Sequence, residues 1–172
     1  TIYNAPGDCA VEGTANYGFS VLGSSMTVSQ CAGTCDQTCP APMANLFFSE
    51  HAEGSSNNKY FEVYNPSSSD VDLADYVFVN CSNGCDDWEY INSFADGAMV
   101  SAGGTWTVCH SSFAGDLSLC NETRTVYHNG DDAQGLMHST SGTLLDIIGT
   151  IGDDPGSGWE VAGVANGTKD HT

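Results

Sequence analysis

The chain consists of short runs of β-branched and aromatic residues, each ended by Gly, Asn, Asp, Ser or Pro. Such runs favour β-strands, and the residues between them favour turns. No window places apolar residues at i, i+3, i+4 and i+7, as an amphipathic helix would. The pattern predicts an all-β sandwich or barrel. The expected strands cover residues 16–23, 25–31, 45–51, 59–65, 75–81, 104–110, 124–130 and 143–152.

One of these runs shows which side chains enter the core. In KYFEVYN, residues 59–65, bulky and polar residues alternate. Neighbouring side chains of a strand point to opposite faces of the sheet. We therefore expect Phe61 and Val63 to face the core, and Tyr60, Glu62 and Tyr64 to face outward.

Charge narrows the range of partners. The 172 residues include 22 acidic and 3 basic side chains, for a net charge of -19. Such a chain repels phosphate groups, so anionic membranes are poor partners and no nucleic-acid partner is expected. No apolar run approaches the roughly 20 residues of a membrane helix, and no membrane insertion is expected. The simplest role of the charge is solubility in salt, while divalent cations and cationic surfaces remain possible partners.

The eight cysteines point to an oxidising compartment. An even number in a loop-rich chain predicts disulfides and a secreted, extracellular or cell-surface protein. The first residues, TIYNAPGDC, show no signal-peptide pattern and are typical of a processed terminus. Cys81 and Cys85 flank an Asn-Gly turn, and Cys109 and Cys120 bracket a loop after a strand, so each pair is expected to bond.

A change in composition divides the chain near residue 43. Residues 1–43 hold three of the five prolines and no Lys or Arg, whereas residues 44–172 carry the denser strand pattern. We expect a disulfide-stapled N-terminal extension followed by one β-domain. Disulfides are favoured over a zinc site in this extension, but spacing does not determine their pairing. The cysteines concerned are Cys9, Cys31, Cys35 and Cys39.

The polar stretch EGSSNN, residues 53–58, is expected to form the corner between two strands. Lys59 follows it, with Glu50, Glu53 and Glu62 nearby in the sequence. One basic residue among three carboxylates predicts an ion pair that fixes the corner. Ligand binding by these side chains is the alternative.

Catalytic motifs are lacking in the sequence. The five histidines are scattered without His-Glu-x-x-His spacing, and neither Gly-x-Ser-x-Gly nor a P-loop occurs. The sequence therefore predicts a protein that is not an enzyme.

Three acidic loops raise the question of a metal. CDDWEY, NGDDAQG and IGDDPGSG place carboxylates beside turn residues. Calcium takes six to eight oxygen ligands, some of which such loops could supply. None has EF-hand spacing, and Asp-Gly clusters also form ordinary turns. If calcium binds, the expected ligands are Asp153 and Asp154 first, then Asp131 and Asp132.

Three Asn-x-Ser/Thr sequons make N-glycosylation possible. They begin at Asn80, Asn121 and Asn166.

Several ordered segments resemble one family. NLFFSEHAEGSSNNKYFEVYNPSSSDVDLADYVF, DGAMVSAGGTWTVC, NGDDAQGLM, LLDIIGTIGDDPGSGWEVAG and TKDHT are similar to the lamin-tail domain of the secreted, microbial type, over about residues 44–172. The resemblance implies an immunoglobulin-like β-sandwich without enzyme activity. It also implies an interaction or anchoring role, commonly beside secreted nucleases or on surface proteins.

The same resemblance raises the possibility of assembly by strand exchange. Relatives usually continue past KDHT into another strand, and the strand-like runs 16–23 and 25–31 could complete a neighbouring domain by strand addition. The expected function is a non-catalytic extracellular structural module of a filament or surface assembly, partnered by itself or by another extracellular protein or glycan. The alternatives are a calcium-dependent adhesion or glycan-binding module, and an accessory domain of a secreted hydrolase.

Overall fold

The computed structural model describes residues 44–170. The expected strands at 16–23 and 25–31 lie outside this range, as do Cys9, Cys31, Cys35 and Cys39. The division near residue 43 and the donor strand therefore stay predictions.

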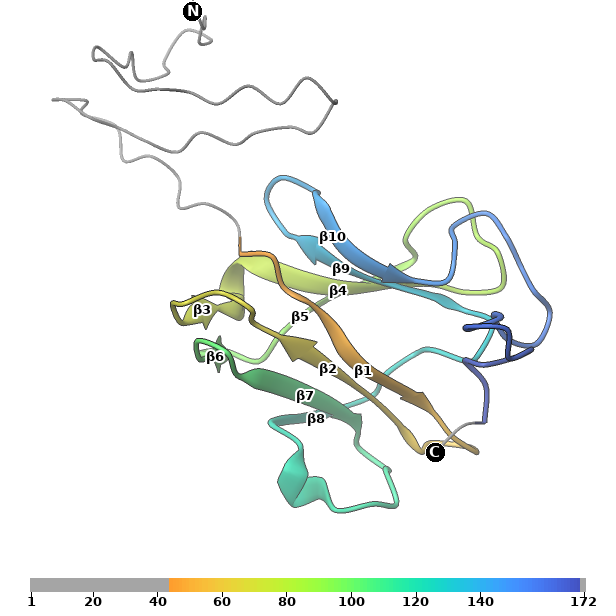
Figure 1. Ribbon diagram of the computed structural model, residues 1–172, viewed down its shortest axis with the longest axis horizontal. Coiled ribbons are helices and arrows are strands. Elements are labelled where there is room, and N and C mark those ends of the chain that lie inside the picture. The colour runs from red at the N-terminus through yellow and green to blue at the C-terminus, as the bar shows by residue number, and fades with distance from the viewer. Residues whose placement is uncertain (1–43, 171–172) are drawn as a thin grey trace, which may run out of the picture. The chain divides into compact units, whose positions relative to one another are not determined.

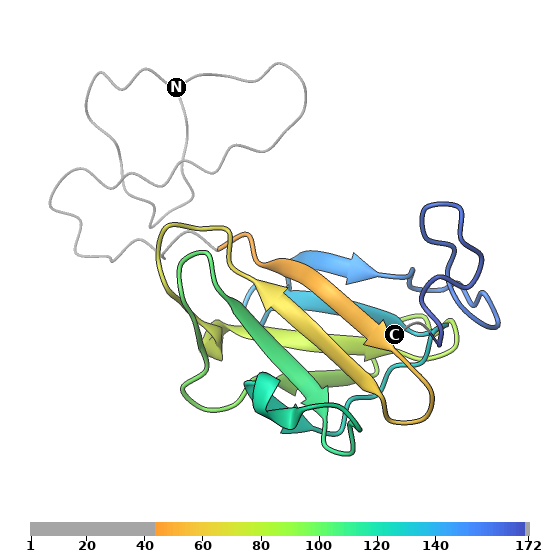
Figure 2. The same cartoon turned by 60° about the horizontal axis from the view of Figure 1, so that its bottom comes forward.

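Two four-stranded sheets form the domain (Figures 1 and 2). The first sheet has the order β1-β2-β7-β8, antiparallel except between β7 and β8. Its strands are β1 (Phe47–Glu53), β2 (Lys59–Tyr64), β7 (Thr105–His110) and β8 (Glu122–Arg124).

The second sheet is antiparallel throughout and has the order β10-β9-β4-β5. It consists of β10 (Leu144–Ile148), β9 (Ala133–His138), β4 (Tyr76–Cys81) and β5 (Tyr90–Ser93). A two-stranded ribbon and two 3-10 turns complete the described elements: β3 (Val71–Asp72), β6 (Met99–Val100), η1 (Leu73–Asp75) and η2 (Leu117–Leu119).

The hydrophobic core lies between the two sheets. Phe61 of β2 packs against Phe78 of β4, with ring centroids 4.9 Å apart. Phe61 and Val63 are fully buried, while Tyr60, Glu62 and Tyr64 are partly exposed, so the expected alternation along β2 is confirmed. The all-β, immunoglobulin-like sandwich is also confirmed.

The expected strand at 124–130 is wrong. β8 ends at Arg124, and residues 125–132 cross to the second sheet as a loop. The sequence pattern also missed the short strands β3 and β6, the edge strand β5, and β9. In β9, Gln134 and Gly135 give no strand-like pattern. Gly135 is required there because a Cβ atom would lie 2.8 Å from the ring of Trp88.

Two disulfides are formed in this part of the chain. Cys81 bonds to Cys85, and Cys109 bonds to Cys120. These are the two pairs that spacing had favoured. The first closes the loop that follows β4, and the second ties the end of β7 to the start of the segment that carries β8.

We expect Phe61→Ala to lower the free energy of unfolding by about 3–5 kcal/mol, because it removes a fully buried ring and leaves a cavity. The matched control is Phe47→Ala on β1, where the side chain is 40 % exposed. Urea unfolding of both variants measures the difference. Equal losses would contradict the assignment of the core face.

Candidate functional site

One end of the space between the sheets is polar. On the second sheet, Asn80 lies opposite Gln134, and Gln134 lies opposite Ile148. Asn80, Gln134 and the loop residue His128 are each only 1 % exposed. A polar interior is costly to bury unless its groups bind one another. Polar groups concentrated at one end of a core are typical of a specific site.

Lys59 lies at the centre of this polar end. Its Nζ donates to the carbonyl oxygen of His128 at 2.6 Å and to Oδ1 of Asn129 at 2.7 Å. It also lies 3.5 Å from Oε1 of Glu53. Lys59 is 7 % exposed and Glu53 is 8 % exposed. The ammonium group therefore has three oxygen neighbours in a site nearly closed to water.

The predicted ion pair of Lys59 is confirmed with Glu53, but it is buried rather than exposed. The other two nearby carboxylates have different partners. Glu50 accepts from the hydroxyl of Tyr60 at 3.3 Å, and Glu62 accepts from Ser49 at 2.7 Å. The EGSSNN corner itself is closed by Gly54 N–H donating to the Asn58 carbonyl at 2.8 Å.

Two histidine rings lie together beside Lys59. The rings of His51 and His128 have centroids 4.6 Å apart, and Nε2 of His128 is 3.3 Å from the carbonyl oxygen of Ala52. Burial, with a smaller contribution from the positive charge of Lys59, lowers the pKa of His51 to about 4 and that of His128 to about 3. Both imidazoles are therefore neutral at neutral pH.

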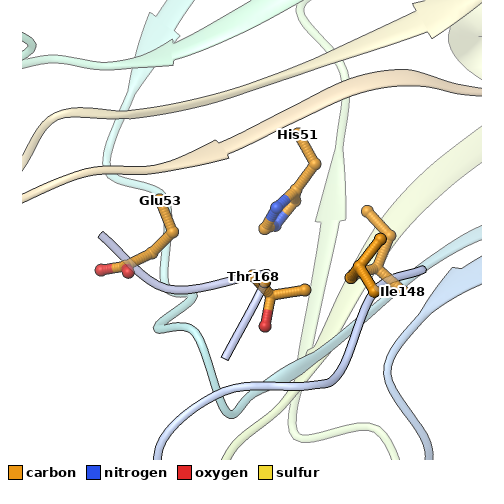
Figure 3. Close-up of a pocket in the computed structure, with 6 residues that line it drawn as sticks. His51, Glu53, Ile148 and Thr168 are labelled. Carbon is orange, nitrogen blue, oxygen red and sulfur yellow. The ribbon is translucent and has the colours of Figure 1, made fainter. Parts of the chain in front are cut away.

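A cavity of about 240 Å³ opens beside these histidines. Figure 3 shows the imidazole of His51 pointing toward the side chains of Thr168 and Ile148. The cavity lies where β1, the end of β10 and the C-terminal segment meet. Its lining consists of His51, Glu53, Ile148, Val161, Gly167 and Thr168.

The C-terminal segment, residues 159–170, closes this end of the domain. Thr168 accepts from the Trp159 N–H at 2.8 Å and donates its hydroxyl to the carbonyl of Gly130. The N–H of Asp170 donates to Oε2 of Glu53 at 3.0 Å. Both oxygens of the Glu53 carboxylate are therefore engaged, one by Lys59 and one by this segment.

The acidic loops lie at the same polar end of the domain, where carboxylates of Asp132 and Asp154 accept hydrogen bonds from backbone N–H groups. Asp132 is buried, and its two oxygens accept from the N–H groups of Asn83 at 3.1 Å and Asn129 at 2.7 Å. Asp154 accepts from Gly156 N–H at 2.7 Å. Gly152 N–H donates to the Cys85 carbonyl at 2.9 Å, which places the 152–156 loop against the first disulfide loop.

Within residues 44–170, no group of three or more His, Cys, Asp or Glu side chains gathers in an arrangement that could hold a metal ion. Asp131 is half-buried, while Asp153 and Asp154 are exposed. Calcium binding at Asp131, Asp132, Asp153 or Asp154 stays a prediction.

The glycosylation sites differ in access. Asn80 lies in β4 between β9 and β5 and is 1 % exposed. The folded domain leaves no room for a glycan there, so the expectation at Asn80 is corrected. Asn121 and Asn166 are exposed, and glycosylation at these two positions stays a prediction.

No sequence pattern indicates that His51, His128, Asn129 and Gln134 form a common site. The one available signal was the position of Lys59, which shares its side of β2 with Phe61 and Val63 and so faces inward. An inward lysine requires acceptors from elsewhere in the chain. The sequence does not show which loop supplies them, because Asn129 is 70 positions away.

The fold defines an immunoglobulin-like module. The chain matches the family model described as Lamin Tail Domain over residues 40–152, and it belongs to that family. Domains of this family are immunoglobulin-like and typically act as interaction modules, and the family is not a known enzyme family. A comparison with curated proteins found no match. The match covers all ten strands, whereas the closing segment 159–170 lies beyond it.

The histidine pair predicts acid sensitivity. Between about pH 6.5 and pH 4 the unfolded chain binds protons that the folded His51 and His128 do not, so the free energy of unfolding falls as pH falls, by up to about 1.4 kcal/mol per pH unit for each histidine. Urea unfolding at several pH values measures this slope. We expect His128→Gln to reduce it and the control His138→Gln to leave it unchanged. A flat profile in the unsubstituted protein would contradict the prediction.

Proposed function

We propose that the chain is a non-catalytic extracellular interaction module that assembles with other copies of itself by strand addition. The occupant is the strand-like part of the N-terminal extension, residues 16–31, of a second copy. It would pair with the outer edge of β1, next to β10. The proposal rests on a difference between the two sides of the sandwich at which the edge strands of the two sheets face each other.

One side of the sandwich is closed by a charged side chain. The guanidinium of Arg124 on β8 donates to the carbonyl of Ser93 on β5 and pairs with Glu122 at 3.1 Å. Glu122 also accepts from the N–H of Ala95 at 2.9 Å. These contacts join the edge strands β5 and β8 of the two sheets.

The opposite side lies between β1 and β10, the other two edge strands. There the carboxylate of Asp146 accepts from the N–H of Phe48 at 2.8 Å, and the cavity lies further along the same side. Phe47 and Leu144, which begin these two strands at the end away from the cavity, are 40 % and 43 % exposed. β1 has seven residues, more than any other edge strand, and so offers the longest row of backbone groups to an added strand.

Charge and disulfides are consistent with this partner. Of the 22 acidic residues in the chain, only three lie in residues 1–43, which carry no basic side chain. The acidic domain therefore repels this extension less than it would repel a second acidic domain.

Two disulfides in the described domain favour an oxidising, extracellular setting. No helix in residues 44–170 is long and apolar enough to cross a membrane.

We expect replacement of residues 16–30 by a Gly-Ser segment of equal length to prevent assembly while preserving the domain of residues 44–170. The replacement removes the strand-like side chains of the extension and keeps all eight cysteines. A Gly-Ser segment is flexible and has low β-propensity, so it is not expected to add to a sheet edge. The matched control replaces residues 1–8, which precede the strand-like runs, in the same way.

Light scattering after size-exclusion chromatography and electron microscopy measure the outcome. We expect oligomers or filaments for the unsubstituted chain and for the replacement of residues 1–8, and monomers for the replacement of residues 16–30. Thermal unfolding of both variants checks that the domain is intact. A monomeric unsubstituted chain at high concentration, or assembly after replacement of residues 16–30, would contradict the proposal.

A further inference from the structure

The arrangement around Lys59 is that of an amine held against a carboxamide. We propose that Lys59 and Asn129 of the same chain become joined by an amide bond between Nζ and Cγ, with Glu53 as the group that transfers protons. This is a covalent modification site, and it does not depend on assembly between copies.

The reacting atoms are already close. Nζ of Lys59 lies 2.7 Å from Oδ1 of Asn129. Since a carbonyl bond is about 1.2 Å long, Nζ lies no more than about 3.9 Å from Cγ. Reacting atoms held at about 3–3.5 Å gain much of the advantage of an intramolecular reaction. A small rotation of the carboxamide therefore brings Cγ within reach of the amine.

The backbone of Asn129 is held in place from the other side. Its N–H donates to Oδ2 of the buried Asp132 at 2.7 Å, and the carbonyl of the preceding His128 accepts from Lys59 at 2.6 Å. Asp132 is thus a positioning residue, because it acts on Asn129 and not on the amine. Asn129 itself is exposed, which leaves a path by which ammonia can leave the site.

Glu53 is placed to accept the proton that makes Lys59 a nucleophile. Its Oε1 lies 3.5 Å from Nζ, and both side chains are nearly closed to water. Glu53 is thus a carboxylate within reach of the amine, in a site from which water is nearly excluded. The closing segment maintains this burial, through Asp170 on Glu53 and Thr168 on Gly130.

The reaction balances without any added reagent. Glu53 takes one proton from the ammonium, and the amine lone pair forms a C–N bond with Cγ of Asn129. The bond between Cγ and Nδ2 then breaks. The two protons lost by Lys59 leave with Nδ2 as ammonium, and Glu53 returns to a carboxylate. The product has one amide N–H at the former Lys59, and no atom is oxidised or reduced.

The bond would connect the two layers of the sandwich. Lys59 begins β2 of the first sheet, and Asn129 precedes β9 of the second sheet. The two residues are 70 positions apart, so the bond would close a long loop. Unlike the disulfides Cys81–Cys85 and Cys109–Cys120, this link would survive reduction.

Intact-mass spectrometry of the folded, full-length protein tests the proposal. After disulfides and any glycans are accounted for, we expect the mass to be lower than that of the sequence by one ammonia. Proteolysis of the reduced protein should then release a branched peptide that contains both Lys59 and Asn129. Tandem spectrometry locates the link.

Two variants separate this reaction from the alternatives. Glu53→Gln removes the proton acceptor, and Lys59→Arg keeps the positive charge but removes the amine, so both should restore the full mass. Asn129 precedes Gly130, and ring closure of Asn129 onto the Gly130 nitrogen would also release ammonia. That product is not branched and would persist in Lys59→Arg.

The proposal is overturned if the unsubstituted protein has the full mass of its sequence. It is also overturned if the lost ammonia maps to Asn129 and Gly130 without Lys59. Neither result requires a variant to fold.

Discussion

The buried ammonium group of Lys59 is the constraint on which the rest of the site depends. A charge removed from water must be matched by an opposite charge and by hydrogen bonds, or the fold does not tolerate it. Here the acceptors come from β1, through Glu53, and from the loop that follows β8, through His128 and Asn129. Glu53 in turn binds the N–H of Asp170. One side chain thereby fixes two strands, a loop and the closing segment.

This constraint also divides the interior into two regions with different chemistry. Around Phe61 and Phe78 the sheets are held by apolar packing, which needs no particular partner. Around Lys59 each contact is directional, and the neutral pair of His51 and His128 fills the space beside it. The cavity lies at this polar end, where packing is incomplete. This domain of the lamin tail family thus has an apolar scaffold and one chemically distinct end.

The sequence predicted the parts of the fold that depend on local patterns. Alternation along β2 identified Phe61 and Val63 as core residues, and spacing favoured the two disulfides found in the described domain. It predicted a strand at 124–130 because Val126 and Tyr127 favour strands locally. The structure has a loop there, and the carbonyl of His128 in this loop binds Lys59. Strand β9 was missed because Gly135 is explained only by the distant ring of Trp88.

The site was less predictable because its members are far apart in the chain. The pairing of Lys59 with Glu53 is local and was expected, but its burial depends on residues 128–130 and 168–170. Likewise, the sequon at Asn80 carries no sign that its side chain points between the sheets. Sequence patterns report which face of a strand is apolar, but they do not report which loop covers a polar side chain that faces inward.

The most direct test of the role of Lys59 is a double-mutant cycle with Glu53 in an Asn129→Ala background, where no amide bond to Lys59 can form, using Lys59→Met, Glu53→Gln and the double variant. The free energy of unfolding of each protein, measured in urea, gives the coupling between the two side chains. If the buried pair organises this end of the domain, the coupling should lie in the upper part of the range for contacting residues, about 1.5–3 kcal/mol. A coupling near zero, as for exposed ion pairs, would contradict this account.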